Sequence, residues 1–159
     1  MKAPRKPKRA GRAGGVGAMT VRSTTNDVGA RLAAAYACDR AGDEHQAIKH
    51  YDAAHRLGVP AAERRKFLVG YGSTLRNVGR TEESVALLAQ AMVDDPQYPP
   101  FAAFLALALM SSGQPRAALA AMLGCALDSA QPGAFDGFDR ALGEYQRELL
   151  EPPVTHRGG

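Results

Sequence analysis

Small and large residues recur at fixed distances from three glycines, Gly42, Gly79 and Gly113. The segments around them, AGDEHQAIKHYDAAHRL, VGRTEESVALLAQAMVD and SGQPRAALAAMLGCALD, align without gaps. The residues seven before, five after and twelve after each glycine are small, and the residue nine after it is large. The small residues are Ala35, Gly72, Ala106, Ala47, Ser84, Ala118, Ala54, Ala91 and Cys125, and the large ones are Tyr51, Leu88 and Met122. This agreement indicates an internal repeat.

Each repeat has the pattern of two antiparallel helices joined at the glycine. A glycine can take the left-handed conformation that ends the first helix, and the residues that follow favour the start of the second. Asp43 and Thr81 are expected to be N-caps, and Pro115 is expected to be a first helical residue. The small residues let two helices approach closely, while the large ones fill the remaining space. The sequence thus predicts three helical hairpins, over residues 28–59, 62–96 and 98–130.

A further amphipathic segment follows the third hairpin. Its apolar residues lie three or four apart, as on one face of a helix, and its other residues are mostly charged. The apolar residues are Phe135, Phe138, Leu142, Tyr145 and Leu149. We expect a capping helix over residues 134–150 and a frayed end over residues 151–159. The predicted fold class is all-α, a right-handed α-α superhelix (solenoid) in residues 26–150.

The spacing of the repeats points to a known family. Successive glycines are 37 and 34 residues apart, and the pattern resembles the tetratricopeptide repeat (TPR) family, whose helix-turn-helix unit has about 34 residues. Pro96 matches the proline that closes this motif, whereas Arg31, Leu68 and Ala102 replace an aromatic residue of the family. The runs YGSTLRNVGR, FLALALMSSGQPRAAL and DRAGDEHQAIKHYDAAHRLGV are similar to the bacterial group 5 subfamily, over residues 28–130. The resemblance implies a scaffold for protein-protein interaction.

The stretch YGSTLRNVGR carries polar residues where a buried helix would carry leucines. In a stack of hairpins the first helices line the concave surface, so we expect these residues to face a groove that binds a partner protein or peptide. The predicted groove residues are Tyr36, Asp39, Arg40, Lys66, Ser73, Arg76, Asn77, Leu107 and Met110. Two interpretations of Arg76 stay open. It forms an ion pair with Asp39 of the preceding repeat, or it is offered to a carboxylate or phosphate of the partner.

The formal net charge of +4 comes from the beginning of the chain. Six Lys and Arg residues precede residue 19, and the remainder has 14 basic and 16 acidic residues. Residues 1–22 are predicted to be a disordered tail because they offer little apolar surface to bury. Two interpretations without a binding role are that this segment is a solvated extension or that translation starts at Met19. An alternative function is an adaptor that binds nucleic acid or an acidic partner through Lys2, Arg5, Lys6, Lys8, Arg9 and Arg12.

The sequence contains no motif of an enzyme. Cys38 and Cys125 lie far apart in the sequence, and His45, His50 and His55 are five residues apart. On one helix such histidines point in different directions and cannot share a metal ion. We therefore predict no catalytic residue, no metal and no cofactor. The chain also lacks an apolar run of signal-peptide or membrane-span length, which predicts a cytoplasmic protein with no membrane partner.

Three repeats are close to the smallest number that forms a stable stack. The apolar end of the first hairpin, around Leu32 and Ile48, is therefore expected to be exposed and to attract a second copy of the chain. This reasoning predicts a homodimer.

Overall fold

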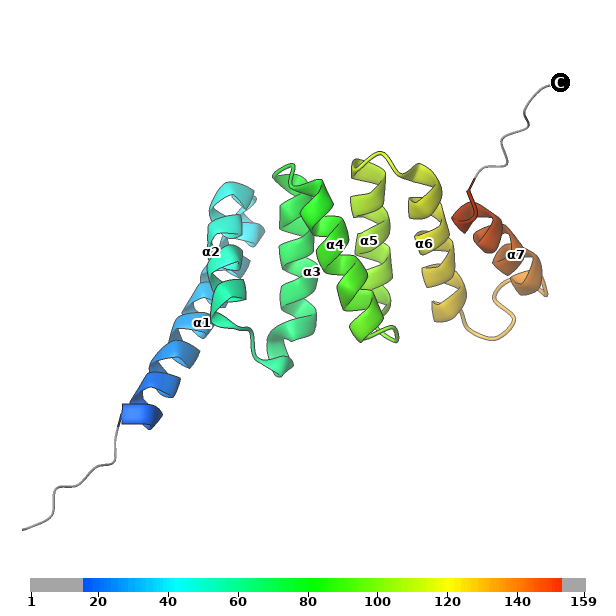
Figure 1. Cartoon of the computed structure of the whole chain (residues 1–159). Helices are drawn as coiled ribbons and strands as arrows, with labels where there is room; N and C mark the ends of the chain where they lie inside the picture. The colour runs from blue at the N-terminus through cyan, green and yellow to red at the C-terminus, as the bar shows by residue number, and fades with distance from the viewer. Residues whose placement is uncertain (1–15, 153–159) are drawn as a thin grey trace, which may run out of the picture.

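The structure, a computed structural model, describes the backbone of residues 16–152 and the side chains of residues 27–152. Over these residues every regular element is an α-helix, which confirms the all-α repeat solenoid predicted from the sequence (Figure 1). The helices are α1 (Val16–Ala41), α2 (Glu44–Leu57), α3 (Ala61–Asn77), α4 (Thr81–Asp94), α5 (Pro99–Ser111), α6 (Pro115–Ser129) and α7 (Asp139–Leu150).

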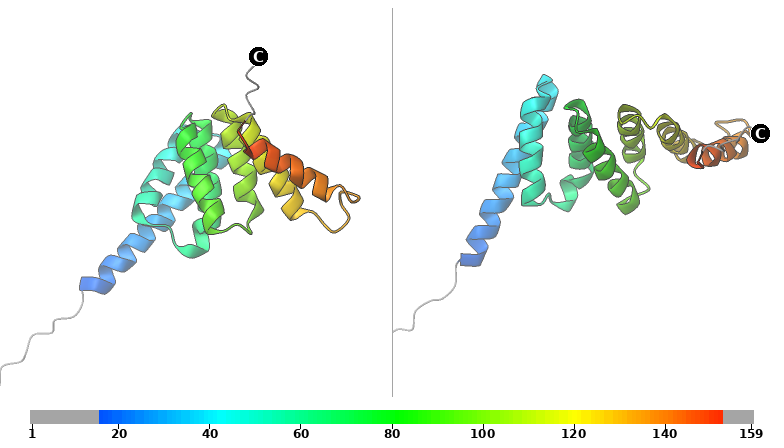
Figure 2. Two further views of the ribbon diagram at one scale, coloured as in Figure 1. Left: turned by 45° about the vertical axis from the view of Figure 1, so that its right-hand side comes forward. Right: turned by 45° about the horizontal axis from the view of Figure 1, so that its top comes forward.

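The first six helices form three hairpins, α1–α2, α3–α4 and α5–α6, which follow one another along the stack (Figures 1 and 2). The first helix of each hairpin packs on both helices of the preceding one. Among the described residues, however, the second helices α2, α4 and α6 do not pack on each other. The stack is therefore narrower on the side of α1, α3 and α5, and this side is the inner surface.

The turns within the hairpins depend on the three repeat glycines. Gly42, Gly79 and Gly113 have φ angles of 73°, 85° and 76°, in the left-handed region where a side chain is disfavoured. Asp43 caps α2, since its carboxylate accepts a hydrogen bond from the Gln46 amide at 3.1 Å. The prediction for Pro115 is confirmed, because α6 begins there. The prediction for Thr81 is wrong: this residue is already inside α4, and its hydroxyl bonds to the adjacent Glu82 side chain.

The small residues of the repeat lie where helices cross, as predicted. Eight of the nine are buried, and Cys125 is partly buried. Gly72 shows why size matters, because a Cβ there would lie 2.7 Å from Cγ of Leu88. The large positions differ between repeats. Leu88 is fully covered by its neighbours, whereas Met122, at the same position of the third repeat, is 40% exposed.

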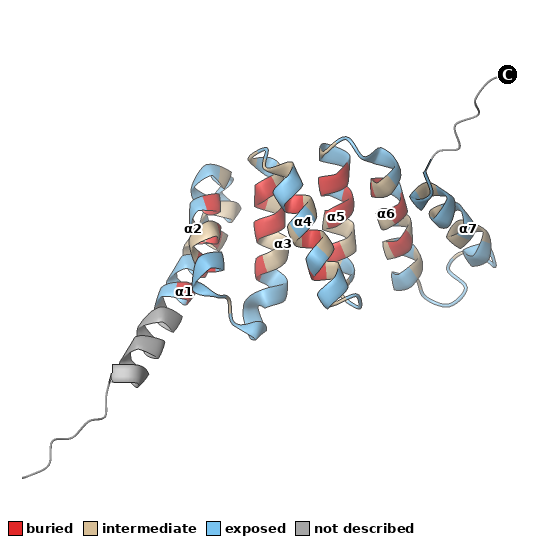
Figure 3. Cartoon of the chain, viewed as in Figure 1, coloured by how far each residue is buried: buried red, intermediate tan, exposed pale blue. Residues whose placement is uncertain are grey.

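Two apolar clusters form the core. The cluster between α1, α2 and α3 is aromatic, with Tyr51, Phe67 and Tyr71 at its centre and ring centroids 5.3–5.9 Å apart. The cluster between α4, α5 and α6 is aliphatic apart from Phe101, and Leu88 and Leu109 are typical members. Figure 3 shows buried residues along α3 and α5 and none on α7. The core thus lies between the hairpins and ends at α6.

The C-terminal helix differs from its prediction. It begins at Asp139 and not at residue 134, because Gly133, Asp136 and Gly137 have positive φ angles that interrupt a helix. Among the described helices it packs on α6 alone. Phe138 and Tyr145, predicted to cover the last repeat, are exposed to solvent. The expectation that this apolar stripe caps the stack is therefore wrong for these two residues.

The N-terminal end of the stack also differs from expectation. Leu32 and Ile48, which are predicted from the sequence to be exposed at the end of the first hairpin, are buried, with exposed fractions of 4% and 9%. Both are buried because α1 and α2 pack closely on each other and on α3. Helix α1 begins at Val16 and so includes part of residues 1–22, for which the sequence predicts a disordered tail. Residues 1–15 and 153–159 of the predicted tail and frayed end lie outside the described residues.

Candidate functional site

Two adjacent cavities, each of about 270 Å³, open on the inner surface of the stack. They share Asp39, Val69 and Gly70 and therefore adjoin each other, and we name the pair of cavities the trough. Its first half is lined by residues of α1, α2 and α3, and its second half by the end of α1, the start of α2, α3 and α5. The first half adds Tyr36, Arg40, Tyr51 and Lys66, and the second half adds Glu44, Ser73, Thr74, Asn77 and Phe104.

Asp39 lies where the two halves meet and joins the first two hairpins. Its Oδ2 accepts a short hydrogen bond from the Tyr51 hydroxyl. Its Oδ1 lies 3.0 Å from the hydroxyl of Thr74, which comes from the next hairpin. Burial, followed by the bond to Asp39, raises the pKa of Tyr51, so this hydroxyl keeps its proton at neutral pH. Asp39 is thus a fixed acceptor that sets the position of α3 against α1 and α2.

Gly70 makes this arrangement possible. A Cβ at this position would overlap the Tyr51 hydroxyl, which passes over α3 on its way to Asp39. A glycine inside a helix costs about 1 kcal/mol of stability relative to alanine, and here the cost is offset by the contact that the missing side chain allows. Gly70 is not among the groove residues predicted from the sequence. An unexplained glycine in the middle of a helix was the available signal.

Arg76 and Asn77 form a polar chain at the far edge of the trough. An Nη of Arg76 donates to Oδ1 of Asn77 at 2.9 Å, and Nδ2 of Asn77 donates to Oε1 of Glu44 at 3.3 Å. The predicted ion pair between Arg76 and Asp39 is therefore wrong. Both carboxylate oxygens of Asp39 are engaged by hydroxyl groups instead. The other interpretation, that Arg76 meets an anionic group of a partner, stays a prediction.

Tyr36 and Lys66 flank the first half of the trough. The Lys66 ammonium lies 4.1 Å from the centroid of the Tyr36 ring, at cation-π distance. The Tyr36 hydroxyl oxygen is buried and has no hydrogen-bond partner among the described residues. Burial, with smaller contributions from the carboxylates of Glu63 and Asp39, raises the pKa of Tyr36 to about 12. The trough therefore contains a protonated donor without an acceptor.

The remaining predicted groove residues belong to α5. Leu107 and Met110 are exposed and occupy the repeat positions of Ser73 and Arg76, six and three residues before the glycine. Neither lines the two cavities. Tyr36, Asp39, Arg40, Lys66, Ser73 and Asn77 do line the trough. The structure thus brings six of the nine predicted residues together, and their role in binding stays a prediction.

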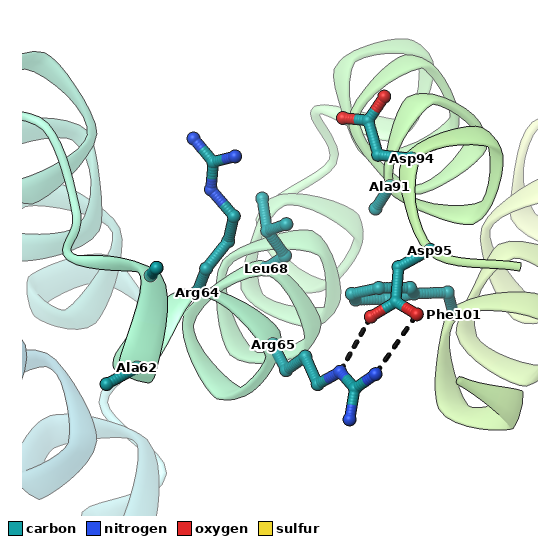
Figure 4. A pocket seen from close by; sticks show the side chains of 9 residues that line it. Ala62, Arg64, Arg65, Leu68, Ala91, Asp94, Asp95 and Phe101 are labelled. Atoms are coloured by element: carbon teal, nitrogen blue, oxygen red, sulfur yellow. Dashed lines mark hydrogen bonds and ion pairs between the residues drawn. The ribbon is translucent and has the colours of Figure 1, made fainter. Parts of the chain in front are cut away.

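A larger cavity of about 380 Å³ lies at the base of the second and third hairpins (Figure 4). Arg65 of α3 and Asp95 form a two-point ion pair there, with N–O distances of 2.6 and 3.0 Å. The Arg65 guanidinium also lies 4.8 Å from the centroid of the Tyr98 ring. Figure 4 shows this pair beside Phe101. Since these groups satisfy one another, we interpret them as a structural contact between α3 and the connection from α4 to α5.

Within residues 27–152, no three His, Cys, Asp or Glu side chains are grouped so that they could hold a metal ion. None of the helices described is both long enough and apolar enough to cross a bilayer.

A family comparison agrees with this architecture. The model of the group 5 family, TPR_5, described as a tetratrico peptide repeat, matches residues 29–149. The chain belongs to the tetratricopeptide repeat family. TPR proteins generally mediate protein-protein contacts and are typically non-catalytic. Searches of curated proteins and of solved structures find no match. The basic arm of this TPR protein, from Lys2 to Arg12, lies outside the described residues, so the alternative function assigned to it stays a prediction.

Proposed function

We propose that this TPR protein is a non-catalytic interaction module that binds an extended segment of a partner protein in the trough. The single observation that carries the proposal is that two adjoining cavities, which share three lining residues, lie along α1, α3 and α5. Two adjoining cavities along the first helices suit an elongated ligand better than a compact one. The proposal includes no reaction, since the polar groups of the trough bond mainly to one another.

The chemistry of the trough supports a peptide as the ligand. Asn77 is exposed and keeps a donor and an acceptor position beyond the bonds it makes to Glu44 and Arg76. Ser73 adds a half-buried hydroxyl to the same half of the trough. Such groups pair with main-chain amides of an extended segment, while Val69 and Phe104 offer apolar surface to its side chains.

Site-specific photo-crosslinking in the native host tests the proposal. A benzophenone amino acid at Asn77, on the rim of the trough, is expected to capture a partner protein through one short segment. The matched control places the same amino acid at Gln90, which is exposed on α4 and lines neither half of the trough. Crosslinks from the Gln90 position alone, or an Asn77 variant that captures no protein, would contradict binding in the trough.

A further inference from the structure

The two halves of the trough differ in charge. The charged residues that line the second half are Asp39 and Glu44, and both are acidic. The first half adds two basic residues, Arg40 and Lys66. Because the halves share Asp39, a bound segment would pass from a basic to an acidic environment within a few residues. A single ligand that fits both halves must therefore present a positive group to the second half.

The carboxylates of the second half have unused acceptor capacity. Each oxygen of a carboxylate can accept two hydrogen bonds, and each Asp39 oxygen accepts one. Glu44 accepts a bond on Oε1 from Asn77, and its Oε2 receives none from the described residues. These oxygens can take the several donors of a lysine or arginine head group. Val69, Gly70 and Phe104 provide the apolar wall that the methylene stem of such a side chain needs.

The first half provides an independent indication of a ligand. The buried Tyr36 hydroxyl is a donor without an acceptor, and leaving such a group unpaired costs free energy. A neutral acceptor, such as a main-chain carbonyl of a bound segment, would satisfy the hydroxyl.

We propose that the trough recognises an extended segment of a partner protein through a lysine or arginine side chain, which enters the second half between Asp39 and Glu44. The main chain of the same segment accepts a hydrogen bond from Tyr36 in the first half. This inference rests on the function proposed above and adds the chemical class of the ligand. A segment with glutamate at that place is rejected by the two carboxylates.

The test measures binding of blocked pentapeptides, acetyl-Ala-Ala-X-Ala-Ala-amide, with X as arginine, lysine, glutamine or glutamate. Binding is followed by amide chemical shifts of the isotope-labelled full-length chain at millimolar peptide. The arginine and lysine peptides are expected to shift the amides of Ser73 and Asn77 and to bind about twofold to fivefold more tightly than the glutamine peptide, as for a partly exposed ion pair. The glutamate peptide is expected to bind weakest.

Two variants separate the contribution of the Glu44 charge to peptide affinity from that of the hydrogen bond between Tyr36 and the peptide main chain. Glu44→Gln keeps an acceptor for Asn77 and is expected to weaken the arginine peptide about threefold while leaving the glutamine peptide unchanged. Tyr36→Phe is expected to weaken all peptides by the same factor. Glu82→Gln, at an exposed residue of α4 outside the trough, serves as the matched control and is expected to change no affinity.

The outcomes distinguish this inference from the proposed function. Equal affinity for the arginine and glutamine peptides, with shifts still in the trough, would overturn the charge preference and leave peptide binding intact. Shifts that map away from the trough for every peptide would overturn both. Salt-dependent shifts of the Ser73 and Asn77 amides with no peptide present would assign the second half to the chain's own residues 2–12, and would overturn its assignment to a partner.

Discussion

The junction between the first two hairpins and the junction between the last two are built by different means. At the first junction, polar contacts surround the aromatic cluster. Asp39 accepts from Tyr51 and Thr74, and Asp52 accepts from Tyr71 at 2.6 Å and from Arg80 at 2.9 Å. At the second junction the buried side chains are aliphatic apart from Phe101, which is buried together with Leu88 and Leu109. The ion pair at its edge, between Arg65 of α3 and Asp95 after α4, is exposed.

The difference explains where the candidate site lies. Hydrogen bonds have preferred directions, so they fix the first junction in one geometry, and polar groups at its inner edge become part of the trough. Apolar contacts have no preferred direction, and the inner surface above the second junction is correspondingly apolar, with Leu107 and Met110 exposed. The position of the candidate site therefore follows from the way in which the repeats are joined.

Alkaline pH should have the largest effect on stability, and it should act on the first junction and not on the second. The pKa of Tyr36 is raised from 10.0 to about 12, and the pKa values of Tyr51 and Tyr71 are raised further, in each case chiefly by burial. A raised folded-state pKa gives stability that is present below pH 10 and is lost as the pH rises through the folded value. We expect the free energy of unfolding to fall steeply above pH 10 because three tyrosines of the first junction act together. Denaturant unfolding monitored by circular dichroism, with tyrosine ionisation read at 295 nm, measures this loss.

The control for this prediction is Tyr51→Phe, which removes one ionisable hydroxyl from the first junction. It is expected to make the alkaline loss of stability smaller. An unchanged pH profile in this variant would show that tyrosine ionisation is not the cause.

Removing the largest side chain of the second junction should have the next largest effect. Phe101 is almost fully buried, and Phe101→Ala is expected to lower the free energy of unfolding by about 3–5 kcal/mol through lost burial and a residual cavity. Urea denaturation measures the change. Since the first junction does not depend on Phe101, the alkaline effect should persist in this variant. A loss below about 1 kcal/mol would contradict the packing described for the second junction.

Breaking the polar contacts of the first junction should cost less. Asp39→Ala leaves the Tyr51 hydroxyl without an acceptor, whereas the Thr74 hydroxyl still reaches the Gly70 carbonyl oxygen at 2.9 Å. An unpaired buried hydroxyl costs about 1–3 kcal/mol. Thr74→Val removes one of these donors, so the double variant should cost less than the sum of the single ones, with a coupling of about 0.5–3 kcal/mol. Thermodynamic double-mutant analysis measures the coupling. Additive effects would mean that Asp39 and Thr74 do not interact.

The smallest effect is expected at the exposed edge of the second junction. Arg65→Lys loses the two-point geometry with Asp95 but keeps the charge, and exposed ion pairs contribute about 0–1 kcal/mol. Thermal unfolding at low and high salt measures this contribution. A loss of several kcal/mol would mean that the ion pair, and not the apolar contacts, holds the second junction together.

The hairpins could be predicted from the sequence because their signals are local. A glycine, the small residues around it and the large residue nine positions later define one turn and one helix crossing in each repeat. The start of α7 was missed although a signal was present. Phe135 and Phe138 have helical spacing, but Gly133 and Gly137 beside them favour the positive φ angles that the structure has.

The polar partners in the trough could not be predicted in the same way. Asp39 and Arg76 occupy equivalent places in neighbouring repeats, and opposite charge suggested a pair. The position of Tyr51 on α2 determines which group pairs with Asp39, since the Tyr51 hydroxyl reaches Asp39 across Gly70. Such a contact depends on side-chain directions in three helices at once. The residues that line the trough were thus predictable from repeat geometry, whereas its hydrogen bonds could be seen only in the folded structure.

The missing side chain at Gly70 also limits how this protein can be rebuilt by gene duplication or by design. The second hairpin fits behind a hairpin that presents a tyrosine at the position of Tyr51, so the first two hairpins form a matched pair that cannot be reordered. The third hairpin carries a similar requirement on its C-terminal side, since a Cβ at Gly124 of α6 would overlap Nε2 of Gln146 on α7. A repeat added after α6 is therefore expected to need a side chain that fits over Gly124 as Gln146 does, while the trough stays unaltered.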